Sequence, residues 1–185
     1  MAKARTPRDA LLDHLGALRV MARALVDSEH RADDLVQDTI VKAWGNIEIF
    51  VPDTNMRAWL YTILRNTLYS DFRKEGREVA DLDGKFAAQL SEKPAHDGRL
   101  LLQDLCDAFR HLTREQREAL LLVGAQGFSY DEAAEISDVS VGTVKSRVCR
   151  GRKFLIERLS LEADHHIVET DRLMIAVTAA RSRIW

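Results

Sequence analysis

The chain has 185 residues, of which 46% are hydrophobic and 30% charged, so it can bury the core of one domain or of two small ones. The charged residues are interspersed too evenly with apolar ones for a disordered chain, and apolar runs such as Leu120–Val123 fall far short of the roughly 20 residues of a membrane-spanning helix. The formal net charge of −2 does not by itself indicate a nucleic-acid-binding protein, because such domains are often strongly basic.

The sign of the charge differs between segments. Residues 27–38 carry five acidic residues and one arginine, whereas residues 142–158 carry six basic residues and one glutamate. The net charge therefore averages a negative and a positive surface, and we expect two partners of opposite charge.

The first residues lack the apolar core of a signal peptide, so we expect a cytoplasmic protein with no membrane partner. Cys106 and Cys149 stand too far apart to suggest a metal site or a disulfide framework. His165 and His166 could in principle bind a metal together with their acidic neighbours, but we expect neither a metal nor a cofactor.

Almost every periodic stretch indicates an α-helix, and none alternates as a strand does. The expected helices cover residues 8–25, 29–46, 56–75, 100–111, 114–126, 130–137 and 141–159. Periodicity is lost at 76–99, where glycines, a proline and many charges indicate a linker. The sequence therefore predicts an all-α chain with two small helical domains, at 8–75 and 100–160, joined by a flexible linker and followed by a tail at 161–185.

The helix expected at 29–46 has an apolar stripe that includes Ala43 and Trp44. Its outer face carries Asp33, Asp34, Gln37, Asp38 and Lys42. An ordinary solvated acidic surface would look the same, and periodicity alone does not separate that reading from a docking surface.

Asn55 or Thr54 can cap the helix expected at 56–75. This helix has a buried stripe that includes Leu60, Leu64 and Leu68. Its other face interleaves aromatic, amide and basic side chains, namely Tyr61, Arg65, Asn66, Tyr69 and Arg73. This mixture suits single-stranded nucleic acid, because each base stacked on a ring contributes about 1–3 kcal/mol. Trp59 fits core packing and DNA contact equally well.

Residues 129–159 have the pattern of a helix-turn-helix. Ser129 and Glu132 form a capping box, as Thr113 and Gln116 do at the start of the helix expected at 114–126. The small pair Ala133-Ala134 allows a close helix crossing. Asp138 stands at the turn, where aspartate tolerates a left-handed backbone. Ser140 can then cap the second helix.

The second of these helices divides into two faces at about 100° per residue. Val144, Val148, Leu155 and Leu159 fall on the core side. Ser146, Cys149, Arg150 and Lys153 point outward, with Lys145 and Arg147 flanking them. Such a surface suits the major groove, where arginine binds guanine and flanking bases hold phosphates. The alternative is a solvated basic face, which the cap, the small pair and the turn spacing disfavour.

Three segments, in this order, resemble the extracytoplasmic-function class of bacterial sigma factors over residues 10–160. DDLVQDTIVKAW resembles the helix that docks on RNA polymerase, FVPDTNMRAWLYTILRN the element that melts and reads the −10 site, and FSYDEAAEISDVSVGTVKSR the −35 reader. TNMRAWLYTILRNTLYSDFRK, REVADLDGKFAAQL and QREALLLVGAQGFSYDEAAEI resemble the alphaproteobacterial general-stress-response subgroup.

The resemblance implies roles for particular residues. Asp33, Asp34, Gln37 and Asp38 would contact the polymerase. Asp53, Thr54, Asn55 and Asn66 would trap a flipped −10 base, with Trp59, Tyr61 and Arg65 as further −10 contacts. Lys145, Ser146, Arg147, Cys149, Arg150 and Lys153 would bind the −35 element. No catalytic group is expected, because the polymerase carries out the chemistry.

The resemblance also implies partners: core RNA polymerase, promoter DNA, and a small anti-sigma factor released by a response regulator with a sigma-like domain. Two alternatives stay open, a sigma mimic that binds an anti-sigma factor without touching DNA, and a helix-turn-helix repressor. The basic outer face disfavours the first, and the helices at 29–75 disfavour the second. Asp138 in place of the turn glycine and the long tail depart from the family; the tail is either an added helix, a frayed end or a regulatory segment.

Overall fold

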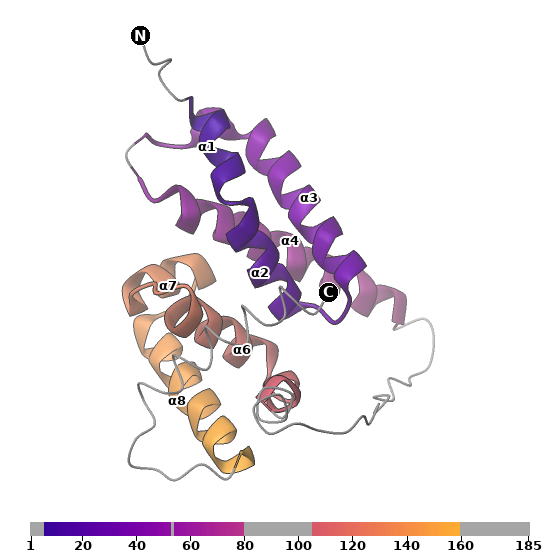
Figure 1. Cartoon of the computed structure of the whole chain (residues 1–185), viewed down its shortest axis with the longest axis vertical. Coiled ribbons are helices and arrows are strands. Elements are labelled where there is room, and N and C mark those ends of the chain that lie inside the picture. The colour runs from indigo at the N-terminus through magenta and orange to yellow at the C-terminus, as the bar shows by residue number, and fades with distance from the viewer. Residues whose placement is uncertain (1–5, 53, 80–104, 160–185) are drawn as a thin grey trace, which may run out of the picture.

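The computed structural model describes residues 6–52, 54–79 and 105–159, and within these ranges the chain is helical with short turns and without a β-strand (Figure 1). The helices are α1 (Pro7–Asp13), α2 (Leu15–Leu25), α3 (Glu29–Gly45), α4 (Met56–Val79), α6 (Arg114–Leu120), α7 (Tyr130–Ser137) and α8 (Val141–Arg158). A 3-10 turn covers Ile47–Ile49, a π-helical turn covers Leu121–Ala125, and residues 105–110 are helical. The predicted all-α class is confirmed, whereas most of the expected linker and the tail at 161–185 lie outside the described residues.

Helices α1 to α4 form the N-terminal domain. α3 packs along α4, and α2 packs on both (Figure 1). Leu18, Leu35, Leu60 and Leu64 are buried between them. The prediction of a single helix at 8–25 is wrong, because the helix is interrupted at His14. This residue caps the end of α1 and the start of α2. Among the described residues, no helix is long and apolar enough to cross a membrane.

Helix α4 begins where its cap predicts. The side-chain oxygen of Asn55 accepts a hydrogen bond from the amide of Ala58 at 3.2 Å, which satisfies one of the free donors of the first turn. Thr54, the other candidate cap, instead donates its hydroxyl to the carbonyl of Val51 at 2.7 Å. α4 then continues beyond its expected end at residue 75 as far as Val79.

Helices α6 to α8, with residues 105–110, form the C-terminal domain, in which α8 packs against α6 and α7. The capping boxes predicted at Thr113 and Ser129 are both present. α8 approaches α6 closely at Gly151, where an added Cβ would lie 2.8 Å from Cδ1 of Leu120. Glycine is needed there because a methyl group would have to displace a buried leucine.

The turn of the helix-turn-helix has the left-handed backbone expected at Asp138. Asp138 has φ 50° and ψ 51°, and the amide of Val139 donates to the carbonyl of Ala134 at 3.1 Å. This bond satisfies one of the carbonyls left free at the end of α7. The aspartate therefore occupies the position that glycine prefers at helix ends.

Asp138→Gly is expected to raise the free energy of unfolding by about 0.5–1 kcal/mol. Relief of the left-handed strain contributes about 1–2 kcal/mol, and the greater freedom of glycine in the unfolded chain removes about half of it. Urea unfolding of the full chain measures the change, with Asp138→Ala as the control. Alanine keeps the strain, so a gain from alanine equal to that from glycine would contradict this account.

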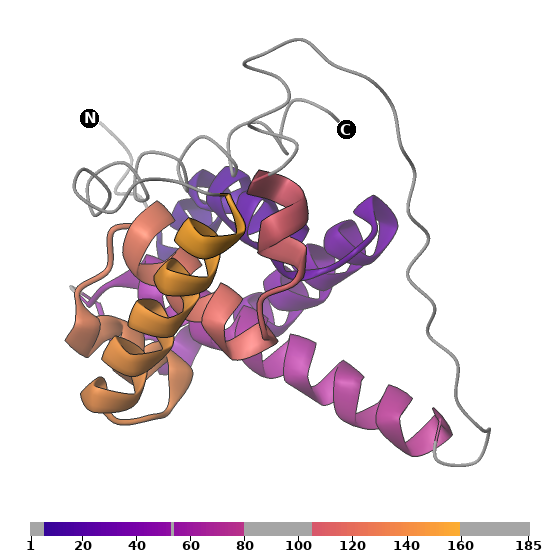
Figure 2. The same cartoon turned by 90° about the horizontal axis from the view of Figure 1, so that it is seen from below.

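The two domains pack against each other. α4 lies against α7, and α2 contacts α6, so a single cluster of buried side chains runs through both domains. The last turns of α4 extend past the C-terminal domain (Figure 2). The face of α4 that looks toward α6 and α7 is therefore covered by protein.

Candidate nucleic-acid interface

The outward face of α8 carries the basic residues that the sequence placed there. Lys145, Cys149, Arg150 and Lys153 are exposed, whereas Ser146 and Arg147 are half-buried. The Ser146 hydroxyl donates to the carbonyl of Thr143 at 2.9 Å. On the opposite side, Val144, Val148 and Leu155 are buried. The predicted division of this helix into a core face and a basic face is confirmed, and we call Lys145, Ser146, Arg147, Cys149, Arg150 and Lys153 the recognition face.

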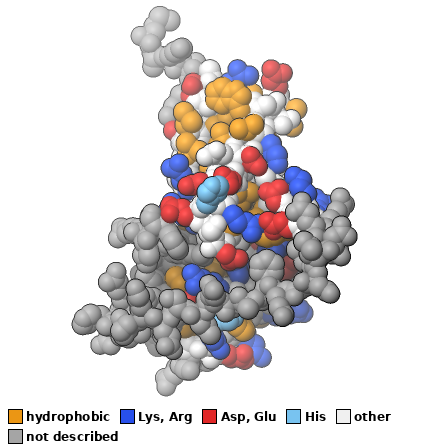
Figure 3. All heavy atoms as spheres, turned by 90° about the vertical axis from the view of Figure 1, so that its right-hand side faces the viewer, with side chains coloured by type: hydrophobic (Ala, Val, Ile, Leu, Met, Phe, Trp, Pro, Cys, Tyr) orange, Lys and Arg blue, Asp and Glu red, His pale blue; other side chains and the backbone are white. Residues whose placement is uncertain are grey.

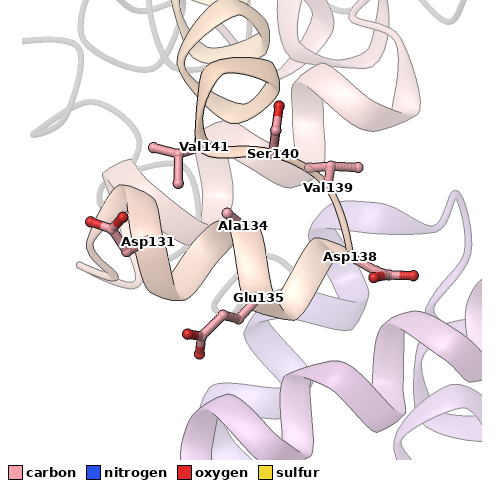
Figure 4. Close-up of a pocket in the computed structure, with 7 residues that line it drawn as sticks. All are labelled: Asp131, Ala134, Glu135, Asp138, Val139, Ser140 and Val141. Atoms are coloured by element: carbon pink, nitrogen blue, oxygen red, sulfur yellow. The ribbon is translucent and has the colours of Figure 1, made fainter.

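A hollow of about 520 Å³ lies between α7 and the start of α8. Figure 4 shows Ala134 near its centre, with the carboxylates of Asp131, Glu135 and Asp138 projecting outward around it. Three acidic groups at this edge repel phosphates. The part of the helix-turn-helix that attracts a nucleic acid is therefore α8, beyond its first turn.

A second pocket, of about 290 Å³, opens on the N-terminal domain between α3 and α4. We call it the base pocket. It is lined by Lys42, Asn46, Ile49, Trp59, Ile63, Asn66, Thr67 and Ser70. Lys42 is fixed at its edge, because its ammonium group donates to the hydroxyl of Thr67 at 3.0 Å. The pocket combines a large aromatic ring with exposed amide donors and acceptors.

Trp59 packs on the core, as one of its two sequence readings predicted, whereas its contact with DNA stays a prediction. Its ring packs on Phe50 with centroids 5.2 Å apart, and it also lines the base pocket with Asn66. Lys42 and Asn46 were missed as site residues. Their spacing of four positions, which places both on one side of a helix end, was the available signal.

Thr54 and Asn55, the described loop residues expected beside Asn66, do not line the pocket. Thr54 bonds to its own loop, as described above, and Asn55 caps α4 while its amide nitrogen donates to Glu132 at 3.1 Å. Asp53 lies outside the described residues. Of the four residues expected to trap a base, the structure thus places Asn66 alone, among those described, in the base pocket.

Tyr61 and Arg65 do not have the exposure that was expected. Tyr61 is 1% exposed, and its hydroxyl lies 3.2 Å from the Ala17 carbonyl and 2.7 Å from Oε1 of Gln126. Burial raises its pKa far above the usual value for tyrosine. Arg65 is half-buried and forms an ion pair with Glu118 at 2.7 Å. Helix periodicity could not reveal this burial, because the covering groups belong to the other domain or to α2.

The acidic face of α3 is partly neutralised by its neighbours. Asp33 lies 3.8 Å from the guanidinium of Arg19 on α2, whereas Asp34, Gln37 and Asp38 are exposed. Figure 3 shows acidic and basic side chains mixed over the side of the molecule that carries α3. The expected negative surface is therefore weaker than residues 27–38 alone suggest.

Trp44 was expected on the buried stripe of α3, and this is wrong. Trp44 is 48% exposed, and Val41 and Ile49, at the same end of the domain, are each 70% exposed. The guanidinium of Arg8 lies over the Trp44 ring, 5.4 Å from its centroid. An arginine stacked on an indole reduces the cost of exposing it.

Within the described ranges, no group of three or more His, Cys, Asp or Glu side chains is placed so that it could hold a metal ion. The candidate pair His165-His166 lies outside those ranges. Cys106 is half-buried and Cys149 is exposed, and the two do not form a disulfide with each other.

Comparison with known proteins identifies two family matches, Sigma-70 region 2 over residues 11–78 and Sigma-70 region 4 over residues 102–155. The chain is 48% identical to the ECF RNA polymerase sigma factor EcfG of Rhodopseudomonas palustris, over 80% of this chain and 82% of that protein.

The solved structures with a similar fold include two complexes. The sigma factor RpoE of Bartonella quintana, in complex with the anti-sigma factor NepR, superposes with a TM-score of 0.73 at 48% identity. The superposition covers 83% of this chain and 96% of the RpoE chain. CnrH, in complex with the cytosolic domain of CnrY, superposes with a TM-score of 0.62 at 28% identity. This superposition covers 88% of this chain and 92% of the CnrH chain.

Proposed function

Because this chain belongs to the extracytoplasmic-function RNA polymerase sigma factors of the sigma-70 family, we propose that it directs the polymerase to stress-response promoters through two separate DNA sites. The observation that carries this proposal is the presence of the base pocket on the N-terminal domain and the recognition face on the C-terminal domain. A sigma mimic would have no use for either surface, and a repressor would have no use for the first.

The recognition face would read the −35 element in the major groove. Arg150, exposed at the middle of α8, is suited to bind two acceptors of a guanine, and Lys145 and Lys153 to hold phosphates on either side. The acidic residues around the hollow of α7 favour entry of the duplex over α8, because they repel the phosphates that would otherwise cross α7.

The base pocket would hold one base of the −10 element after it leaves the duplex. Its volume of about 290 Å³ is at the lower end for small-ligand sites. Trp59 offers a ring on which a base can stack, and Asn66 an amide that can bond to the exposed base edge. Lys42, held at the rim by Thr67, would attract the adjoining phosphate.

The outer face of α3 would dock on a basic surface of the polymerase through Asp33, Asp34, Gln37 and Asp38. The polymerase would supply the catalysis, and the chain would act in the cytoplasm at the nucleoid. An anti-sigma factor is the further partner we propose, since the similar RpoE structure is a complex with the anti-sigma factor NepR and the similar CnrH structure is a complex with the cytosolic domain of CnrY. Its release by a response regulator with a sigma-like domain belongs to the same proposal.

The test of this function is transcription from a family promoter by core polymerase with and without the purified chain. Transcripts that require both components are expected. Anti-sigma binding without any core-dependent transcript would establish the sigma mimic instead, and tight binding to duplex DNA without polymerase would establish the repressor.

Reversal of two charges on α3 tests the docking surface. Asp34→Lys combined with Asp38→Lys is expected to weaken binding to core polymerase on the order of tenfold, because both carboxylates are exposed and act at an interface rim. Binding to the isolated −35 duplex should not fall. Glu48→Lys, an exposed reversal outside α3, is the control, and an equal loss from it would show that net charge alone is responsible.

A further inference from the structure

A buried carboxylate joins the two domains. Glu118 of α6 is 2% exposed. Its Oε1 lies 2.7 Å from Nε of Arg65, and its Oε2 accepts a hydrogen bond from the hydroxyl of Tyr69 at 2.9 Å. Both partners belong to α4, so one side chain of the C-terminal domain holds two side chains on a face of α4 that the sequence assigned to single-stranded DNA. We call Glu118, Arg65 and Tyr69 the clasp.

The same face of α4 is held at its other end. The Arg57 guanidinium donates to the Gln126 carbonyl at 2.9 Å and lies 4.5 Å from the centroid of the Phe128 ring. Tyr61 bonds to the Gln126 side chain and meets Phe128 edge to face at 5.5 Å. The C-terminal domain therefore covers α4 from Arg57 to Tyr69, about three turns of helix.

The clasp contributes little net free energy to the packing of the two domains, because opposing effects nearly cancel. Burial raises the pKa of Glu118, while Arg65 and the hydroxyl of Tyr69 lower it. Desolvation of a buried ion pair roughly offsets its attraction, so separation of the domains would return both charges to water at little net cost. If one partner is removed while the domains stay together, the other charge is left buried and unpaired. Such an arrangement suits a contact that must open.

We propose that the clasp holds the free chain in a closed state, in which Glu118 takes the place of a DNA phosphate on Arg65 and the C-terminal domain covers the polar face of α4. This inference depends on the proposed function, because the covered face matters only if α4 follows the opened −10 strand. The base pocket, which opens between α3 and α4, is not part of the covered face. The chain must open before the strand can run along α4 from the base pocket.

Energy transfer between two dyes tests the closed state in the full chain. The native Cys149 and an introduced Glu48→Cys, both at exposed positions, carry the dyes in a Cys106→Ser background. A single high-transfer population is expected. Glu118→Gln keeps the shape of the side chain but removes its charge, and should raise the ratio of open to closed molecules on the order of tenfold.

Two further variants make the result specific. Glu135→Gln removes the same charge from an exposed position of the C-terminal domain and should leave the ratio unchanged. Tyr69→Phe removes one hydroxyl of the clasp and should shift the ratio in the same direction as Glu118→Gln, which covers the case in which that variant fails to fold.

Binding of a short single-stranded DNA of mixed sequence should tighten in Glu118→Gln relative to Asp107→Asn, because a larger fraction of molecules is competent to bind. Asp107→Asn removes one negative charge from an exposed position of the C-terminal domain outside the acidic hollow. A low-transfer population in the unaltered chain, or identical ratios in Glu118→Gln and Glu135→Gln, would overturn the inference. These measurements need no polymerase. A closed chain that yields no core-dependent transcript contradicts the proposed function alone, and an open chain that yields transcripts contradicts the closed state alone.

Discussion

Asn66→Ala is expected to lower the yield of open promoter complexes by about tenfold or more. The Asn66 side chain is exposed on α4 and lines the base pocket beside Trp59. A flipped base costs a few kcal/mol of lost stacking and pairing, and hydrogen bonds to its edge must offset that cost. Loss of an amide that reads a base edge costs about 1–3 kcal/mol, which is roughly five- to 150-fold in an equilibrium constant. Permanganate footprinting of unpaired thymines measures the yield directly.

The same substitution distinguishes base capture from general attraction to DNA. Binding to the −35 duplex should not change, because Asn66 carries no charge and lies on the other domain. Lys74→Ala is the matched control, since Lys74 is exposed on the same helix and outside the pocket. It should lower opening only slightly and in a salt-dependent way. Equal defects from Asn66→Ala and Lys74→Ala would show that the pocket does not hold a base.

Arg150→Ala is expected to weaken binding to the −35 element by about 1–3 kcal/mol. Arg150 is exposed at the middle of the recognition face, on the helix surface opposite Val148 and Leu155. If it binds a guanine, its loss should relax discrimination at one base pair while other positions keep their preference. Competition binding against single-base variants of the element measures this change.

Arg158→Ala is the control for Arg150. Arg158 is an equally exposed arginine in the last turn of α8, two turns beyond Arg150. Its loss should act equally on all sequences, because a phosphate contact carries no base preference. If Arg150→Ala behaves in the same way and also reduces the slope of log K against log salt concentration by about one, then Arg150 contacts phosphate alone.

Local features of the chain could be predicted because their physical causes are local. The boxes at Thr113 and Ser129 satisfy amides within their own first turn. Asp138 takes the left-handed turn because the next helix must start there. The core face of α8 follows from helix periodicity, with Val144 and Val148 buried as expected.

Features that depend on a neighbouring element could not be predicted in this way. Asp33 lies close to Arg19 on another helix, so the acidic stretch of the sequence is not an equally acidic surface. Trp44 is apolar and in phase with the core stripe, yet it lies at an exposed end of α3 under Arg8. The base pocket joins the end of α3 to the middle of α4, and its residues Lys42 and Asn46 became evident only when the two helices were placed side by side.

The sequence by itself determined the helical class, the helix-turn-helix with its basic outer face and the order of the sigma-like segments, since periodicity, caps and charge spacing act within one helix. The tertiary structure decided which side chains of α4 are free. Tyr61 and Arg65 have the spacing of a DNA-contacting face, but Gln126 and Glu118 of the other domain occupy it. The physical reason is that a polar group on a helix surface bonds to whatever partner packs against it, and that partner lies about 50 to 65 positions away in the chain.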